Sequence, residues 1–147
     1  MGRLSGIARR EAKHAAMQTL SSAEISAATG VAADLRGRPG KRQVTVLSSR
    51  AWQAACAELG KQLPWTLRRA NLLVDELDLP QSAGAVIAIG GVRLQVTMEV
   101  APCSRMEGQQ AGLQKALTPD WRGGVACTVL QGGRVALGDD VDVLDAD

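Results

Sequence analysis

The sequence predicts a mainly β domain, a barrel or a sandwich, with few helices. Three observations predict this class: short apolar or alternating segments recur along the chain, glycine-rich turns separate them, and helical patterns are rare. The 147 residues are enough for one domain with a sizeable core, and no internal repeat divides them.

The clearest strand is predicted at 92–100. Its apolar positions alternate with polar ones, which places one set of side chains on a buried face: Val92, Leu94, Val96, Met98 and Val100. Gly90 and Gly91 predict a tight turn after a strand at 85–89. Gly132–Gly133 predicts a hairpin turn between two of the shorter strands. These shorter strands are predicted at 43–47, 125–130, 134–137 and 141–144.

Residues 48–60 predict a helix that begins at a capping serine and ends at Gly60. Its apolar stripe follows helical spacing and consists of Trp52, Ala55, Cys56 and Leu59. A second short helix is predicted at 108–117, where Leu113 and Leu117 share a face. The segment 20–42 is expected to be an extended loop, and the acidic tail 145–147 is expected to be frayed beyond a domain core of about 5–143.

The composition argues against several classes of protein. No run approaches the roughly 18 apolar residues of a membrane span, and the N-terminus lacks the apolar region of an export signal, so a cytoplasmic location is expected. The chain has no Phe and no Tyr, which disfavours the stacking of nucleic-acid bases. A hydrolase built on a His base would have to use the single histidine, His14.

The charge is balanced in total but uneven along the chain. The formal net charge is +2, yet residues 1–50 contain nine Lys or Arg against three Asp or Glu, and the last ten residues contain five Asp. Such asymmetry permits a local site for an anion, although two solvated ends of opposite sign would give the same pattern.

The three cysteines differ in their surroundings. Cys56 and Cys127 lie on apolar stripes and are expected to be packed core thiols. Cys103 follows a strand and Pro102, where the chain leaves the sheet and where functional side chains often lie. Arg105 would place positive charge near the sulfur and favour the thiolate. Cys103 is therefore either a functional thiolate or a packed loop thiol.

Three basic segments could bind an anion. They are 66–74 with Arg68, Arg69 and Asn71, then 120–125 with Arg122 before Gly123 and Gly124, and 35–44 with Arg36, Arg38, Lys41 and Arg42. A guanidinium can grip a phosphate with two hydrogen bonds, and adjacent glycines let backbone N–H groups approach an anion. Together with one thiolate, they suit a phosphorylated ligand that carries a soft metal.

The sequence resembles the MOSC family, named for the C-terminal domain of molybdenum cofactor sulfurase, and most of all its small stand-alone bacterial members. The resemblance extends over about residues 5–143. The segments that carry it are, in order, GVAADLRGRPGKRQVTVLS (30–48), RRANLLV (68–74), AIGGVRLQV (88–96), PCSRM (102–106), WRGGV (121–125) and GGRVALGDDV (132–141). It implies a closed or nearly closed β-barrel with a few short helices.

The resemblance also implies a function tied to sulfur and molybdenum. The family cysteine falls on Cys103, as a thiolate ligand to molybdenum in the pterin cofactor (molybdopterin) or as a persulfide-bearing sulfur carrier. Arg69, Asn71 and Arg122 would contact the phosphate and pterin edge of the cofactor. Such a protein could be a molybdenum-dependent oxidoreductase or a sulfur-transfer protein.

The resemblance further implies which partners to expect, and the chain departs from the family's pattern at two positions. No room exists here for the pyridoxal-dependent desulfurase domain of larger relatives, so this chain is not expected to bind pyridoxal phosphate. A cysteine desulfurase or a redox protein would be its partner, with no nucleic acid and no membrane. The family often has Gly where this chain has Ala33, before Asp34, and Pro where it has Ala70.

Two other hypotheses remain. One is a non-catalytic β-barrel module whose basic loops bind a nucleic acid or a protein, with binding that weakens with salt and does not depend on Cys103. The other is a thiol hydrolase or redox enzyme, which the lone His14 and the missing resolving cysteine disfavour.

Overall fold

The computed structural model describes residues 2–13 and 15–144; His14 and the predicted acidic tail 145–147 lie outside the described residues. The strands are β1 (Gly2–Arg9), β2 (Gln18–Thr19), β3 (Ser22–Ser26), β4 (Gly30–Val31), β5 (Val44–Ser48), β6 (Leu72–Asp75), β7 (Val86–Ile89), β8 (Val92–Glu99), β9 (Val125–Gln131), β10 (Gly133–Ala136) and β11 (Asp140–Leu144). The helices are α1 (Ser49–Leu59), α2 (Ser104–Gln109) and α3 (Leu113–Leu117), with 3₁₀ turns η1 (Trp65–Arg68) and η2 (Pro119–Trp121).

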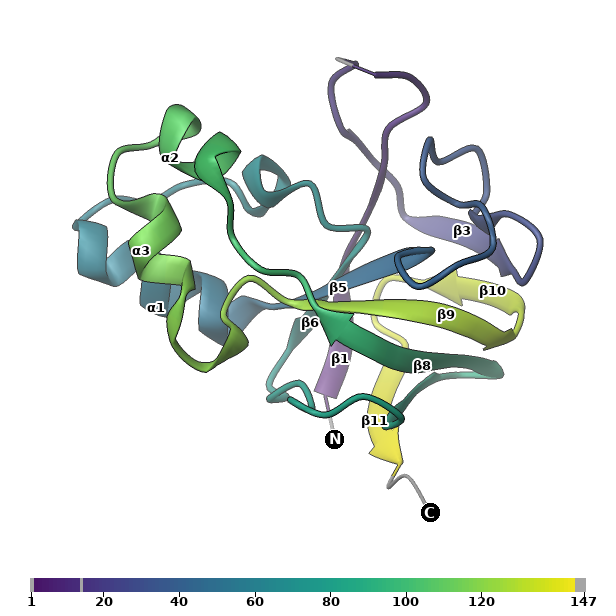
Figure 1. The fold of residues 1–147 in the computed structure, drawn as a ribbon. Helices are drawn as coiled ribbons and strands as arrows, with labels where there is room; N and C mark the ends of the chain where they lie inside the picture. Colours follow the sequence, from purple (N-terminus) through teal and green to yellow (C-terminus); the bar gives the residue numbers. More distant parts are fainter. Residues whose placement is uncertain (1, 14, 145–147) are drawn as a thin grey trace.

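The strands form a closed barrel, as predicted. Within the described residues, seven strands pair in the order β11-β7-β8-β9-β5-β6-β1, and β1 pairs with β11 to close the ring. All of these neighbours are antiparallel except β5 and β6, which α1 connects as a parallel pair. Closure leaves these strands without a free edge. The three helices gather beside one end of the barrel (Figure 1).

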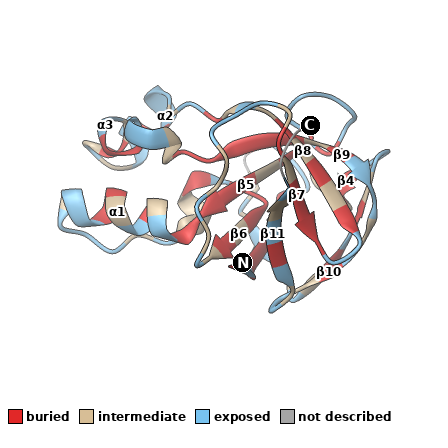
Figure 2. Ribbon diagram, turned by 90° about the horizontal axis from the view of Figure 1, so that it is seen from below, coloured by how far each residue is buried: buried red, intermediate tan, exposed pale blue. Residues whose placement is uncertain are grey.

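The core has two parts. The larger fills the barrel with aliphatic side chains from every barrel strand, among them the fully buried Leu4, Val46, Leu72, Ile87 and Leu94. The smaller lies between the helices and the outside of β5, where Leu47 packs with side chains of α1, α2 and α3. Buried residues therefore run along the barrel strands and along the inward faces of the helices (Figure 2). None of the helices in the described part of the chain is both long and apolar enough to cross a membrane.

The prediction of an extended loop at 20–42 is wrong in part. This segment contains β3 and β4, which form a small second sheet in the order β10-β3-β4. Ala23 and Ile25 of β3 are buried in the barrel core. Two alternating apolar residues are too short a pattern to distinguish a strand from a loop in the sequence.

The hairpin predicted at Gly132–Gly133 is also wrong. β10 pairs with β3 and not with β9, the strand before it. Gly132 lies so close to β3 that a Cβ atom there would overlap the Ile25 carbonyl oxygen. The glycine signal thus marks a close approach of two strands from different parts of the chain.

The other strand predictions hold with one exception. Ile89 pairs with Val92 across Gly90–Gly91, which confirms that hairpin, and Gly90 has a positive φ of 54°. Met98, predicted to be buried, is 39% exposed. The pairing of β8 with β9 shifts between Val96 and Met98, and such an irregularity turns the next side chain away from the core.

The helix predicted at 48–60 is confirmed as α1. The Ser48 hydroxyl accepts the Ala51 N–H, and Gly60 ends the helix in the left-handed region with φ of 64°. The helix predicted at 108–117 is instead broken into α2 and α3. Gly112 has φ of 85° at the break, and the Glu107 carboxylate accepts the N–H groups of Gly112 and Gln114 and so caps α3. Leu113 and Leu117 share a buried face as predicted.

Candidate functional site

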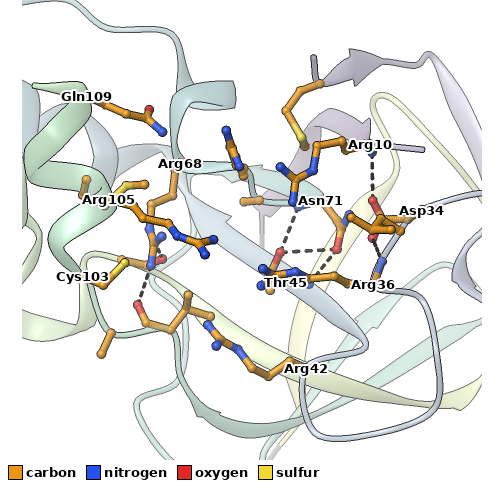
Figure 3. Close-up of a pocket in the computed structure, with 18 of the residues that line it drawn as sticks. Arg10, Asp34, Arg36, Arg42, Thr45, Arg68, Asn71, Cys103, Arg105 and Gln109 are labelled. Atoms are coloured by element: carbon orange, nitrogen blue, oxygen red, sulfur yellow. Dashed lines mark hydrogen bonds between the residues drawn. The ribbon is translucent and has the colours of Figure 1, made fainter. Parts of the chain in front are cut away.

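A cavity of about 900 Å³ opens where several chain segments meet at the helical end of the barrel. The end of β1, the loop before β5, the turn after η1, and the segment from β8 into α2 line it. Its polar side chains are Arg10, Lys13, Asp34, Arg36, Arg42, Thr45, Arg68, Arg69, Asn71, Cys103, Arg105 and Gln109. Figure 3 shows Cys103, Arg68 and Arg105 on one side of this cavity, and Arg10, Asp34 and Arg36 on the other.

Cys103 is exposed to this cavity, whereas Cys56 and Cys127 are buried. It precedes α2 in extended conformation, and its carbonyl accepts the Met106 N–H. The thiol therefore lies where the chain turns from the strand into the helix, beside Arg68 and Arg105.

The surroundings of Cys103 favour its thiolate. The backbone N–H of Arg105 has the largest effect and lowers the pKa of the thiol; the Met106 N–H and the charges of Arg68 and Arg105 lower it further, while slight burial opposes them. Burial instead raises the pKa of Cys127 to about 12. Cys103 is thus suited to act as a nucleophile or a soft metal ligand, and Cys127 is an inert core thiol.

Arg68 holds two walls of the cavity together. It is only 8% exposed, and its guanidinium donates to the Val100 carbonyl from Nη2 at 2.7 Å and to the Gly123 carbonyl from Nε at 3.0 Å. Burial lowers the pKa of Arg68, although the charge of Cys103 acts in the opposite direction. Arg68 thereby fixes the strand end before Cys103 against the glycine pair that follows η2.

Asn71 lines the cavity but uses its amide to join strands. Its Oδ1 accepts the Thr45 N–H at 3.0 Å and the Thr45 hydroxyl at 3.3 Å (Figure 3). Its Nδ2 donates to the Ala8 carbonyl at 3.2 Å. The side chain is buried and connects β1, β5 and β6 beneath the cavity. Its amide is therefore committed to holding the floor of the site.

The structure brings together all but one of the predicted site residues. Cys103, Arg69, Asn71, Arg105 and Gly123 line the same cavity. Arg122 does not line it, because its Nη1 pairs with the Glu58 carboxylate at 2.5 Å and donates to the Ala116 carbonyl at 3.0 Å.

Gly123 is glycine for a steric reason. A Cβ atom there would overlap the Val100 carbonyl oxygen and press on the Arg68 guanidinium. Glycine is therefore needed at position 123 for Arg68 and Val100 to lie as they do in this wall of the cavity.

Sequence reasoning missed Arg10 and Asp34 as parts of the site. Arg10 follows β1, whose small residues hid the strand pattern, and Asp34 lies in the segment predicted to be an extended loop. The Asp34 carboxylate accepts the Arg10 N–H at 2.9 Å and the Arg36 N–H at 3.2 Å, so it orders both arginine backbones. The sequence signal that could have predicted β1, and so placed Arg10 at its end, is the alternation of Arg3 and Ser5 with Gly2 and Leu4, which the structure buries.

The model of the MOSC domain family matches residues 16–142 of the chain. This chain belongs to the MOSC family. A comparison with curated proteins gives no significant match.

Solved structures similar to this MOSC domain show the same fold. The YuaD protein from Bacillus subtilis is 19% identical with a TM-score of 0.80, over 97% of this chain and 94% of that one. YiiM from Geobacillus stearothermophilus is 15% identical with a TM-score of 0.77, over 99% of this chain and 76% of that one. YiiM from Escherichia coli is 13% identical with a TM-score of 0.72, over 97% and 70%.

One departure from the MOSC pattern has a structural counterpart. Ala33, at which the resemblance to the family leads us to expect glycine, lies in the left-handed region with φ of 66°. This conformation is unfavourable for alanine by about 1–2 kcal/mol, and it directly precedes the Asp34 that orders Arg10 and Arg36.

We expect Ala33→Gly to stabilise the protein by about 0.5–1 kcal/mol, because relief of strain exceeds the added freedom of the unfolded chain. Urea unfolding followed by circular dichroism would measure the change. The matched control is Ala32→Gly, whose position lacks a positive φ and which should destabilise the protein. An Ala33→Gly variant that is less stable than wild type would contradict the strain argument.

Proposed function

We propose that this MOSC domain binds the molybdenum cofactor in the cavity, with the Cys103 thiolate as a ligand to molybdenum. The observation that carries the proposal is the juxtaposition of the exposed Cys103 thiol with a cluster of basic side chains around one cavity. Thiolate is the protein ligand that soft metals prefer, and arginines bind phosphate.

The residues of the cavity fit a metal that arrives already chelated. Within residues 2–13 and 15–144, no group of three or more His, Cys, Asp or Glu side chains is placed to hold a metal ion. The lining instead offers the single thiol Cys103 and a surplus of cations. When bound, the cofactor would supply two-electron redox chemistry or sulfur chemistry at the metal.

The chain's own residues would divide the work of binding. Cys103 would hold the metal end, aided by the N–H of Arg105, which favours the thiolate. Arg68 would keep Cys103 in place through its bond to Val100, while Arg69 and Arg105 would offer hydrogen bonds to anionic groups. The cations converge on a concave site, which favours a compact anion over an extended nucleic acid.

The same thiol supports a second candidate function, that of a sulfur carrier. A pyridoxal-dependent cysteine desulfurase would be the donor. The Cys103 thiolate would attack the terminal sulfur of the donor's persulfide, a new S–S bond would form, and the donor cysteine would leave as its thiolate. Cys103 is exposed, whereas Cys56 and Cys127 are buried. This difference favours the carrier role, because a buried thiol is poorly placed to attack and resolve a persulfide on Cys103.

The test is native mass spectrometry with molybdenum analysis on protein from a host that makes the cofactor. We expect wild type to carry about one molybdenum per chain with a pterin-sized adduct, and Cys103→Ser to carry neither. A gain of one sulfur on Cys103 without metal, after incubation with a desulfurase, would support the carrier function instead. Equal molybdenum in both proteins would refute ligation by Cys103.

A further inference from the structure

The basic side chains of the cavity are poorly compensated. Among the described residues that line it, Asp34 is the one acidic side chain. Both of its carboxylate oxygens accept backbone N–H groups, from Arg10 and Arg36, rather than guanidinium groups. The basic lining residues are Arg10, Lys13, Arg36, Arg42, Arg68, Arg69 and Arg105.

Arg10 is the most unusual of these cations. It is only 7% exposed, yet its guanidinium makes no hydrogen bond to any other described residue and lines the cavity. Its backbone is fixed on both sides, since the N–H donates to Asp34 and the carbonyl accepts the Leu35 N–H at 2.7 Å. None of the buried side-chain nitrogen and oxygen atoms of the described residues lacks a hydrogen-bond partner, so the unbonded nitrogens of Arg10 reach the open cavity. An anion in the cavity can therefore take the place of water as the acceptor for this guanidinium.

Neighbouring positive charges add to the effect of burial on the Arg10 guanidinium. Burial has the largest effect and lowers the pKa of Arg10; the positive charges of Arg69 and Arg36 lower it further, and Asp34 only partly opposes them. Arg68 offers a contrast on the opposite side of the cavity. It is equally buried, but the Val100 and Gly123 carbonyls satisfy it, so it is structural while Arg10 remains open to a ligand.

We propose that Arg10, Arg36 and Arg69 form a subsite for a phosphate monoester dianion, on the side of the cavity away from Cys103. Three guanidinium groups match the terminal oxygens and the double negative charge of such a group. The inference rests on the proposed function in one respect, namely that the phosphate belongs to the molybdenum cofactor. The cofactor would then lie across the cavity with its phosphate at Arg10 and its metal at Cys103. Figure 3 shows Arg10 and Arg36 across the cavity from Cys103.

Inorganic phosphate can probe this subsite without any molybdenum. Wild type would be produced in a host that cannot make the cofactor and titrated with phosphate by isothermal calorimetry. We expect saturable binding that Arg10→Gln weakens roughly 10- to 100-fold, as expected for loss of charged hydrogen bonds. Arg36→Gln, at an exposed position, should also weaken binding and serves if Arg10→Gln does not fold.

Two control variants sharpen the result. Arg38→Gln removes an exposed cation from the same loop but outside the cavity lining and should bind phosphate as wild type does. Arg134→Gln, which removes an exposed cation on β10 outside the cavity lining, should also bind phosphate as wild type does. Absence of saturable binding in wild type, or equal binding by wild type, Arg10→Gln and Arg36→Gln, would overturn the subsite.

The source of the phosphate is tested separately in a host that makes the cofactor. If the subsite holds the cofactor's phosphate, Arg10→Gln should also purify with less molybdenum than wild type. If Arg10→Gln loses phosphate binding but retains full molybdenum, the subsite stands and serves another phosphate ester. If wild type binds phosphate but never carries molybdenum, the proposed function fails and the subsite survives.

Discussion

Replacement of Arg68 by alanine should lower the free energy of unfolding by about 2–4 kcal/mol. The variant leaves the carbonyls of Val100 and Gly123 without their donors and opens a void between two walls of the cavity. Because those walls carry the strand end before Cys103 and the glycine pair, the site should lose its shape as well.

The neighbouring Arg69 provides the matched control. It also lines the cavity, so its replacement by alanine removes the same charge, but it is exposed and its side chain makes no hydrogen bond to another described residue. We expect Arg69→Ala to change stability by less than about 0.5 kcal/mol. Urea unfolding of both variants would measure the difference, and similar losses for the two would show that Arg68 is no structural anchor.

Alkylation should separate the cysteines of the ligand-free protein by a large factor. At pH 8, a thiol whose pKa is about 12 is about 10⁻⁴ ionised, so Cys127 should react at least about 10³-fold more slowly than Cys103. Peptide mass spectrometry after timed exposure to iodoacetamide would give both rates. Labelling of Cys127 as fast as Cys103 in the folded protein would contradict the burial that separates them.

The pH dependence of the Cys103 reaction has a definite sign. Because its surroundings lower the pKa of the thiol, the reaction should retain its full rate below the pH at which an ordinary cysteine begins to protonate, and should fall only as the pH drops through that lowered pKa. Arg105→Gln removes one of the smaller contributions and should move the midpoint slightly upward. A midpoint for wild type above that of a free cysteine peptide would contradict the assignment.

Much of the fold could be predicted because its signals are local. The alternation at 92–96, the turn at Gly90–Gly91 and the cap at Ser48 each depend on nearby residues, and each is confirmed. The second sheet escaped prediction because β10 pairs with β3, more than a hundred residues earlier in the chain. No local pattern at Gly132 distinguishes a hairpin turn from a close approach between distant strands.

The same distinction between local and long-range information applies to the site. Cys103 stood out because a proline, a strand end and a nearby arginine are adjacent in the sequence. The separate tasks of the arginines could not be predicted, because burial and hydrogen-bond partners decide them: Arg68 is bound to carbonyls, Arg122 is bound to Glu58, and Arg10 is buried without an acceptor among the described residues. In sequence these side chains are alike.

The most direct test of the central claim is the alkylation of Cys103 in wild-type protein that carries the cofactor. Ligand-free protein and a molybdenum-loaded fraction would be treated with iodoacetamide under the same native conditions, and the peptide containing Cys103 would be quantified. If the thiolate holds the metal in this cavity, Cys103 should react in the ligand-free protein and remain unmodified in proportion to the molybdenum bound. Equal labelling of Cys103 in both fractions would show that the Cys103 thiolate does not hold the metal.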